Sequence, residues 1–224
     1  MVGVENENKA QLKEYEQYFE VRLPPDPRRV LVWKEIVQYL EKYLRGAEAV
    51  LEVGAGYCAF INAVKALKRV AQDQSAVVAE YAAKGVNAHQ GLVTNLNFAG
   101  ANEFDVVLSS NVFEHLTRTE FLDTLQEIKR VLKPGGRLII VQPNFRFAYK
   151  RYFDDYTHVQ IFTDTSLSQL LTANGFVIQK VEPRFTPYSM SATSLPIPAW
   201  IIRLYLRLPW RPMAGQMLVV ASKI

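Results

Sequence analysis

Short apolar runs alternate with stretches of helical periodicity along most of this chain. Seven of the runs have the length and the β-branched content of strands. They cover Val50–Val53, Arg69–Asp73, Val86–His89, Phe104–Leu108, Arg137–Val141, Phe176–Val181 and Met217–Ser222. This regular alternation of strand and helix predicts a doubly wound α/β sheet.

Apolar residues at helical spacing fill the intervals between the predicted strands. Helices are expected over Val30–Leu44, Phe60–Leu67, Ala76–Lys84, Thr119–Leu132 and Thr165–Ala173. A further, charged helix is expected over Ala10–Glu20, before the prolines of Pro24–Pro27. The 224 residues suffice for one domain: a helical cap (1–46), a core (47–183), an insert rich in Pro and Arg (184–214) and a terminal strand (215–224).

The first predicted strand ends in two glycines, Gly54 and Gly56. Glycine suits a tight turn in which the backbone takes positive φ and approaches a ligand closely, with amide groups directed at it. Read as G-x-G-x-x-A, with Asp73 about 20 residues later, the turn fits a dinucleotide fingerprint. Read as E-x-G-x-G, it places the carboxylate of Glu52 just ahead of the loop. This charge repels a pyrophosphate and suits a ligand that carries an ammonium and a sulfonium.

The E-x-G-x-G turn resembles motif I of the class I S-adenosylmethionine (SAM) dependent methyltransferases. FDVVLSSNVFEHL, Phe104–Leu116, resembles motif IV of small bacterial members, and RVLKPGGRLIIV, Arg130–Val141, matches the family closely. The similarity covers about Ala47–Val181 and implies a Rossmann-like sheet of seven strands whose last strand is antiparallel. One departure is Cys58, which stands where the family pattern often has a third glycine.

The resemblance also implies where SAM binds. The amino acid end is expected against Glu52, Gly54, Ala55 and Gly56, the ribose against Asp73 and Gln74, and the adenine edge and remaining contacts near Leu92, Asn95 and Asn111. Leu92 and Asn95 replace acidic residues that are usual in the family. For Asp73, the alternative interpretation is the N-cap of the following helix.

The segment Gln142–Thr163 is polar and aromatic and contains the sequence DDYTH. It is similar to the D-x-T-H to F-T segment of methyltransferases found in glycan and lipid-linked biosynthesis, which implies O-methylation of a sugar or lipid-linked glycan. His158, with His115 next in line, is the expected general base, because an imidazole pKa near 6.5 suits proton removal. Asp155 is expected to orient it. No metal is predicted, because Asp154 and Asp155 are adjacent carboxylates without further spaced ligands.

Two other functions compete with methyl transfer. A nicotinamide-dependent oxidoreductase would need a pyrophosphate turn without Glu52 and a Tyr and Lys at helical spacing, whereas Tyr149 and Lys150 are adjacent. A non-catalytic SAM-fold module that binds a partner is the third hypothesis, motivated by Cys58 and Leu92. Nucleic acid is disfavoured, because the formal charge of +4 arises from a basic tail after Glu182 without aromatic-basic motifs.

The segment Ile197–Arg211, IPAWIIRLYLRLPWR, is apolar with arginines on one helical face and tryptophans at its flanks. It is too short to span a bilayer, and it suits the interface between headgroups and acyl chains. The alternative is that its side chains pack on the core or on a second copy. The polar start of the chain and the single cysteine predict a cytoplasmic enzyme. The segment Ile197–Arg211, if interfacial, would associate it with the inner face of the membrane.

Overall fold

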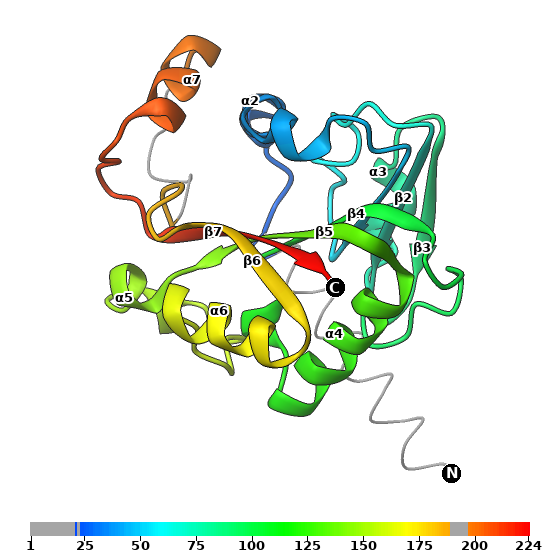
Figure 1. Cartoon of the computed structure of the whole chain (residues 1–224). Helices are drawn as coiled ribbons and strands as arrows, with labels where there is room; N and C mark the ends of the chain where they lie inside the picture. The colour runs from blue at the N-terminus through cyan, green and yellow to red at the C-terminus, as the bar shows by residue number, and fades with distance from the viewer. Residues whose placement is uncertain (1–20, 22, 189–196) are drawn as a thin grey trace.

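A single mixed sheet runs through the computed structural model, which describes residues 21, 23–188 and 197–224 (Figure 1). Its strand order is β3-β2-β1-β4-β5-β7-β6, and β7 is antiparallel to both of its neighbours. The strands are β1 (Ala49–Val53), β2 (Lys68–Asp73), β3 (Val86–Gln90), β4 (Phe104–Ser110), β5 (Leu132–Pro143), β6 (Phe176–Glu182) and β7 (Gln216–Lys223). The predicted seven-stranded doubly wound sheet with an antiparallel last strand is therefore confirmed.

Helices cover both faces of the sheet (Figure 1). They are α2 (Pro27–Leu44), α3 (Val77–Tyr81), α4 (Arg118–Val131), α5 (Phe145–Ala148), α6 (Asp164–Ala173) and α7 (Ala199–Arg207), with the 3₁₀ turns η1 (Phe113–His115) and η2 (Tyr152–Asp154). Side chains cap the longer ones: Asp26 accepts from the amide of Arg28 at the start of α2, and Thr117 forms a capping box with Glu120 at the start of α4. The predicted helix Ala10–Glu20 lies outside the described residues.

The helix predicted over Phe60–Leu67 is wrong, because the chain there forms a series of turns. The amide of Ile61 donates to the Glu52 carboxylate at 3.0 Å instead of to a helical carbonyl. The side chain of Asn62 bonds the backbone of Tyr81 and Ala83, which also ends α3 earlier than the predicted Lys84. Tertiary contacts thus compete with the local helical hydrogen bonds, of which only Asn62 to Cys58 and Val64 to Phe60 are formed in this described segment.

The KPGG turn is drawn into the start of β5. Phe104 pairs with Leu132 while Val106 pairs with Arg137, so the residues between them bulge out of register. Positive φ at Gly135 accommodates the bend. Strand β5 is therefore longer than the predicted Arg137–Val141, and its regular part coincides with that prediction.

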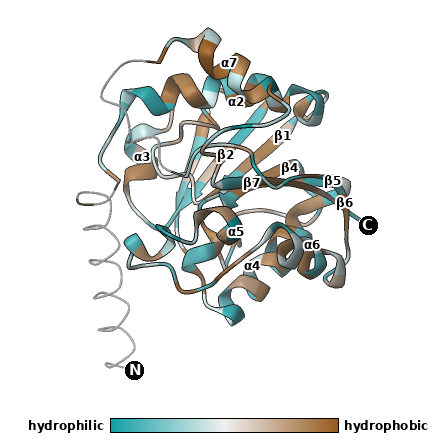
Figure 2. Ribbon diagram, turned by 90° about the vertical axis from the view of Figure 1, so that its left-hand side faces the viewer, coloured by the Kyte–Doolittle hydropathy of each residue, from teal (hydrophilic) through white to brown (hydrophobic). Residues whose placement is uncertain are grey.

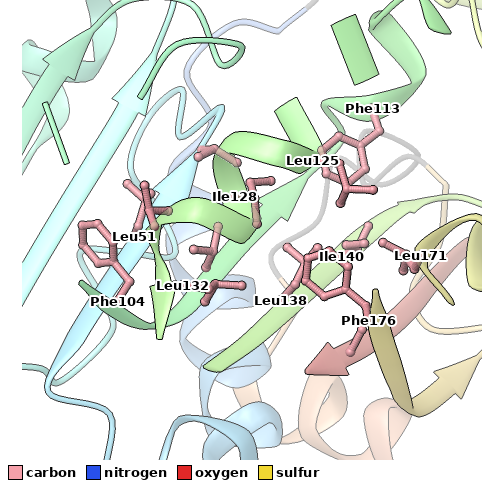
Figure 3. Packing of buried hydrophobic residues seen from close by; sticks show 14 of the residues in the cluster. Leu51, Phe104, Phe113, Leu125, Ile128, Leu132, Leu138, Ile140, Leu171 and Phe176 are labelled. Atoms are coloured by element: carbon pink, nitrogen blue, oxygen red, sulfur yellow. The ribbon is translucent and has the colours of Figure 1, made fainter. Parts of the chain in front are cut away.

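The sheet separates two apolar clusters. Every residue of β1 is buried, with Leu51 packing on the side of α4 and α6 and Val50 on the side of α2 and α7. Figure 3 shows the cluster that contains Leu51, in which Ile128 of α4 packs with Phe104 and Leu138 of the sheet. Burial on both faces is typical of parallel strands covered by helices, and it fixes the strand ends that carry the site.

Helix α7 lies along α2 and contacts it through one face only (Figure 2). Ile202 and Leu206 are buried, and the guanidinium of Arg203 forms a two-pronged ion pair with Glu35 of α2, at 2.9 and 3.1 Å. The opposite face, with Trp200 and Leu204, stays exposed. One face of the segment Ile197–Arg211 therefore packs on the domain, as the packing alternative expected. The other face presents apolar side chains to solvent, so the membrane interpretation stays a prediction.

Arg211 fastens the end of this segment to the core. Its guanidinium is buried and donates to Glu182 at the end of β6, to the carbonyls of Arg184 and Leu206, and to the hydroxyl of Tyr39 on α2. The phenol of Tyr39 in turn donates to Glu182. One arginine thus joins α2, α7 and the sheet edge.

We expect Arg211→Ala to lower the free energy of unfolding by about 3 to 5 kcal/mol, because it removes the buried guanidinium that pairs with Glu182 and leaves this carboxylate with only the more distant Lys180, at 3.9 Å. Urea unfolding measures the change. Arg207→Ala, which removes an exposed arginine of α7, is the matched control and should stay within ~0.5 kcal/mol of the parent. An Arg211 variant as stable as the control would contradict the role of this residue.

Candidate active site

The carboxyl ends of β1 and β4 meet where the strand order reverses, and loops from both strands open there. In open α/β sheets this switch point is where ligands bind. The loop after β1 contains the two glycines, and the loop after β4 contains Asn111 and the turn η1. The predicted cofactor loop and motif IV are therefore neighbours.

The loop after β1 requires glycine at position 54. Gly54 has φ +65°, and a Cβ there would lie 2.2 Å from Cγ2 of Val112. Gly56 and Cys58 also have positive φ, 47° and 56°. Cys58 thus takes the left-handed conformation expected of the family's third glycine, and its buried thiol packs against the carbonyls of Gly56 and Val78.

The end of β2 holds this loop in place. The Asp73 carboxylate accepts from the amides of Gly56 at 2.7 Å and Ser75 at 2.8 Å, and it is almost fully buried. Each carboxylate oxygen has a further lone pair, so the ribose contact expected of Asp73 stays a prediction beside this bracing role. Sequence reasoning missed Gln72, whose side chain bonds the amide of Gly54 and the carbonyl of Gly91 and so links the loops after β1 and β3.

Glu52 places a buried acid directly beneath the glycine loop. Burial, the largest influence, raises the pKa of its carboxyl to about 8, although the amide of Ile61 stabilises the ionised form. Within the described residues no lysine or arginine forms an ion pair with Glu52. A buried carboxylate without a cation fits a ligand that brings its own positive charge, as the ammonium of SAM does.

The remaining predicted cofactor residues line the rim of the same edge. Ala55 donates its amide to the carbonyl of Gln72, and the carbonyl of Gln74 accepts from Gln90. Leu92 is exposed, and Asn95 lines a polar surface pocket together with residues of α4. The adenine contacts of these two residues stay a prediction.

Asn111 connects the loop after β4 with the last strand. It has φ +53°, and its side-chain oxygen accepts from the Gln216 amide at 2.8 Å, while its backbone amide donates to Val141. Gln216 begins β7, which no motif marked as part of the site. The floor of the site thus depends on a strand far along the chain.

Three of the predicted catalytic residues come together beyond η1. The rings of His115 and His158 are 4.8 Å apart between centroids, and Asp155 Oδ2 lies 4.0 Å from His158 Nε2. The hydroxyl of Thr157 lies 2.6 Å from Asp155 Oδ1 and 2.8 Å from His115 Nδ1. Burial, with a smaller effect of His158, lowers the pKa of His115 to about 4, so its ring is neutral near pH 7.

The hydrogen-bond chain fixes the tautomer of His115. A carboxylate only accepts, so the single proton of the Thr157 hydroxyl goes to Asp155, and the hydroxyl oxygen then accepts from His115 Nδ1–H. The lone pair of His115 therefore resides on Nε2. This assignment rests on hydrogen-bond geometry, and it gives the ring a defined atom for binding or proton transfer.

Buried polar atoms without hydrogen-bond partners in the described part of the chain surround this edge. They are Ser109 Oγ, both side-chain atoms of Gln142 and both carboxylate oxygens of Glu114. Strand pairing puts Ser109 beside Ile140, so Ser109 and Gln142 point to the same face of the sheet. Since buried polar groups are ordinarily satisfied, this arrangement favours a polar ligand or ordered water here. Only side-chain contacts reveal Ser109 and Gln142, and no sequence motif marks them.

Comparison with known proteins agrees with this geometry. A family model described as a methyltransferase domain matches residues 51–140. An uncharacterized protein from Methanocaldococcus jannaschii is 33% identical over 115 residues, which cover 51% of this chain and 49% of that protein. The match thus spans about half the length of this curated relative.

Solved structures share the fold at low sequence identity. A SAM-dependent methyltransferase from Archaeoglobus fulgidus superposes with a TM-score of 0.67 and 19% identity, covering 94% of this chain and 99% of its own. A SAM-dependent methyltransferase from Thermotoga maritima gives a TM-score of 0.64 and 22% identity, covering 95% of each chain.

The sheet order and the glycine loop define the class I methyltransferase fold. Residues 51–140 of this chain match the model of a methyltransferase domain, and S-adenosylmethionine is the cofactor of the methyltransferases that share this fold. The residues present fit this cofactor, because Glu52 places a buried carboxyl beneath the glycine loop, and the ammonium of SAM would stabilise the ionised form that burial disfavours.

We expect Glu52→Gln to weaken SAM binding and to stabilise the ligand-free protein at high pH. The folded-state pKa of Glu52, about 8, is above the ordinary 4.5, so its stabilising contribution is complete below pH 4.5 and is lost as pH rises through 8. Glutamine keeps the bond to Ile61 without this loss. At pH 9 its Tm should exceed the parent's by at least ~2 °C, and the two should converge near pH 4.

Isothermal titration calorimetry measures the affinity of the parent and of Glu52→Gln for SAM and for NAD. The parent should bind SAM and not NAD, and Glu52→Gln should lose about 1 to 3 kcal/mol of SAM affinity, the range for a hydrogen bond to a charged group. Unchanged SAM affinity in the variant would contradict the placement of the ammonium against Glu52.

Proposed function

We propose that this chain transfers the methyl group of SAM to a hydroxyl of a sugar or a lipid-linked glycan. The observation that carries the proposal is the hydrogen-bonded chain from Asp155 through Thr157 to His115, at the edge of the sheet where the cofactor loop opens. An oriented imidazole is suited to removing the proton of an acceptor hydroxyl. Methyl transfer to a thiolate needs no such base, because a thiolate has already lost its proton.

Methyl transfer is an in-line displacement. The acceptor oxygen forms a bond to the methyl carbon while the bond from that carbon to sulfur breaks, and S-adenosylhomocysteine leaves with the electron pair of that bond. The acceptor proton passes to the histidine pair, His158 and His115, with Asp155 orienting His115 through Thr157 and facing His158 directly. Alignment of donor and acceptor supplies much of the rate, because the methyl carbon is already activated.

Aromatic side chains support a sugar as the acceptor. Tyr149, Phe153 and Tyr156 belong to the segment that carries Asp155 and His158, and each is more than half exposed. Exposed rings beside buried polar atoms provide the mixture of apolar faces and oriented donors that a carbohydrate ring contacts. The polar atoms of Gln142 and Ser109 then serve as hydrogen-bond partners for acceptor hydroxyls.

The exposed face of α7 supports a lipid-linked acceptor. Trp200 is 64% exposed, Trp210 is 65% exposed, and Ile201 and Leu204 lie between them on the surface. Arg207 adds positive charge to this face, which suits the headgroups of anionic lipid. No helix among the described residues is long and apolar enough to cross a bilayer. Contact would therefore be peripheral, at the inner face of the membrane.

The oxidoreductase alternative is disfavoured by Glu52, whose buried acid would oppose a pyrophosphate. The non-catalytic alternative is disfavoured by the histidine cluster, because a binding module needs neither an oriented imidazole nor buried polar atoms beside the cofactor loop. The positive φ of Cys58 further indicates that this substitution preserves the loop geometry.

We expect His158→Ala and His115→Ala each to lower the rate of methyl transfer by about 10²- to 10⁴-fold while SAM affinity stays nearly unchanged, because each removes a member of the proton-accepting pair. Transfer of labelled methyl from SAM to a mixture of glycan and lipid-linked acceptors measures the rate. His89→Ala is the matched histidine control, because His89 stacks on Phe98 away from the cluster. Parental turnover in both cluster variants would overturn the proposed role.

We expect the chain to sediment with anionic liposomes at low salt and to be released in part at high salt. Replacing the exposed Trp200 and Leu204 by serine should abolish sedimentation, because these side chains supply the apolar contact. Val177→Ser, an exposed apolar position on β6, is the matched control. Parent protein that stays in the supernatant at every salt concentration would leave α7 with a packing role alone.

A further inference from the structure

Beside the proposed acceptor site, Glu114, His115 and His158 direct their side chains at one another. One ligand-type atom from each, a carboxylate oxygen and two imidazole nitrogens, lies within 4.8 Å of the other two. Glu114 and His158 are buried and His115 is partly buried. The three residues come from the turn η1 and from the loop after η2, so the fold and not local sequence brings them together.

Of the three residues, Glu114 gives the strongest indication of a ligand, because its carboxylate is buried without a partner among the described residues. Its side chain is 1% exposed, and neither carboxylate oxygen has a hydrogen-bond partner in the part of the chain that the structure describes. No lysine or arginine of the described residues forms an ion pair with it. Its backbone carbonyl, by contrast, accepts from Val159 and Gln160, which holds the residue in place against the loop. A buried carboxylate without a partner is costly unless a cation or a proton neutralises it.

The neighbours of His115 prepare its ring as a ligand. The chain from Asp155 through Thr157 places the proton on Nδ1 and the lone pair on Nε2. Metal-binding histidines ordinarily donate their second ring nitrogen to a carboxylate, a carbonyl or a hydroxyl that fixes the tautomer and the ring orientation. The Thr157 hydroxyl, oriented by Asp155, is such a partner.

We propose that Glu114, His115 and His158 bind a divalent transition-metal ion such as Zn²⁺, Mn²⁺ or Co²⁺. Two imidazoles with one carboxylate are a ligand set that these ions accept, whereas Mg²⁺ and Ca²⁺ prefer oxygen ligands alone. Bonds of about 2.0 to 2.2 Å bring ligand atoms to within roughly 3 to 3.5 Å of one another. The three atoms lie within 4.8 Å of one another, so small side-chain movements would bring them to this spacing.

The ion-binding inference extends the proposed function, and it rests on that function only for its catalytic consequence. Three protein ligands leave coordination positions open for the acceptor hydroxyl. A coordinated hydroxyl loses its proton more readily, because the ion stabilises the oxyanion. With the ion bound, the two histidines would act on the acceptor as ligands of the ion, and the acceptor proton would pass to solvent instead of to the ring nitrogens.

Ion binding can be measured without methyl transfer. Protein stripped with a chelator is titrated calorimetrically with Zn²⁺, Mn²⁺ and Mg²⁺, and bound Co²⁺ is followed by its visible absorption. We expect a single ion per chain for the transition metals and no comparable binding of Mg²⁺. Glu114→Gln, which keeps the side-chain shape, should abolish the site. Thr157→Val should weaken binding by about 10- to 100-fold, as loss of an outer hydrogen bond does.

His89→Ala is the matched control and should bind the ion as the parent does, since His89 lies outside the cluster. Circular dichroism of each variant establishes that it is folded. Absence of transition-metal binding by the parent, or parental affinity in folded Glu114→Gln, would overturn the inference. If the stripped protein still methylates a hydroxyl at the full rate, the catalytic consequence fails while the proposed function stands. If the ion binds and no hydroxyl acceptor is methylated, the metal site stands and the proposed function fails.

Discussion

The structure of the site depends on the hydrogen bonds with which the end of β2 holds the loop after β1. Asp73 accepts the amide of Gly56, and Gln72 bonds the loops on either side of its own strand. These contacts maintain three positive-φ residues in a row of five, an arrangement that would otherwise be costly at Cys58. The cofactor loop is therefore shaped before any ligand arrives, and its rigidity derives from the buried parallel sheet below it.

The central strands β1, β4 and β7 were predictable from the sequence because they are buried on both faces and so appear as continuous apolar runs, whereas the edge strands β3 and β6 are only partly buried. Helix α4 was predictable for a similar reason, since its apolar face has helical spacing and its capping box is local. The segment after the glycine loop was not predictable. Its helical pattern is real, but Ile61 and Asn62 bond to side chains and backbone of distant residues, and such tertiary partners leave no periodic signal.

The residues of the site likewise fall into those that local sequence motifs predict and those that only the folded structure reveals. Glu52, Gly54 and Asp73 could be placed from motifs, because the loop after β1 has a fixed spacing relative to two strands. The sequence marked His115 and His158 in two separate motifs, and it did not show that their rings lie side by side. Gln72, Gln142 and the unpartnered oxygens of Glu114 could not be found from the sequence, because their importance lies in which atoms they contact or fail to contact after folding. The sequence prediction of no metal considered only the acidic pair Asp154 and Asp155, and the proximity of Glu114, His115 and His158 becomes visible only after folding.

The position of β7 affects how the chain can fold during synthesis. This strand follows all the others in sequence, yet it lies between β5 and β6 and supplies the only link between them in the sheet. Strands β1 to β6 therefore leave the ribosome before the sheet can close. Until β7 emerges, the edge of β5 at Leu138–Val141 is an unpaired apolar strand, which is the kind of surface that other nascent chains and chaperones bind. The pairing of β5 and β6 through β7 therefore cannot form before β7 has emerged, and until then the apolar edge of β5 is open to misassembly.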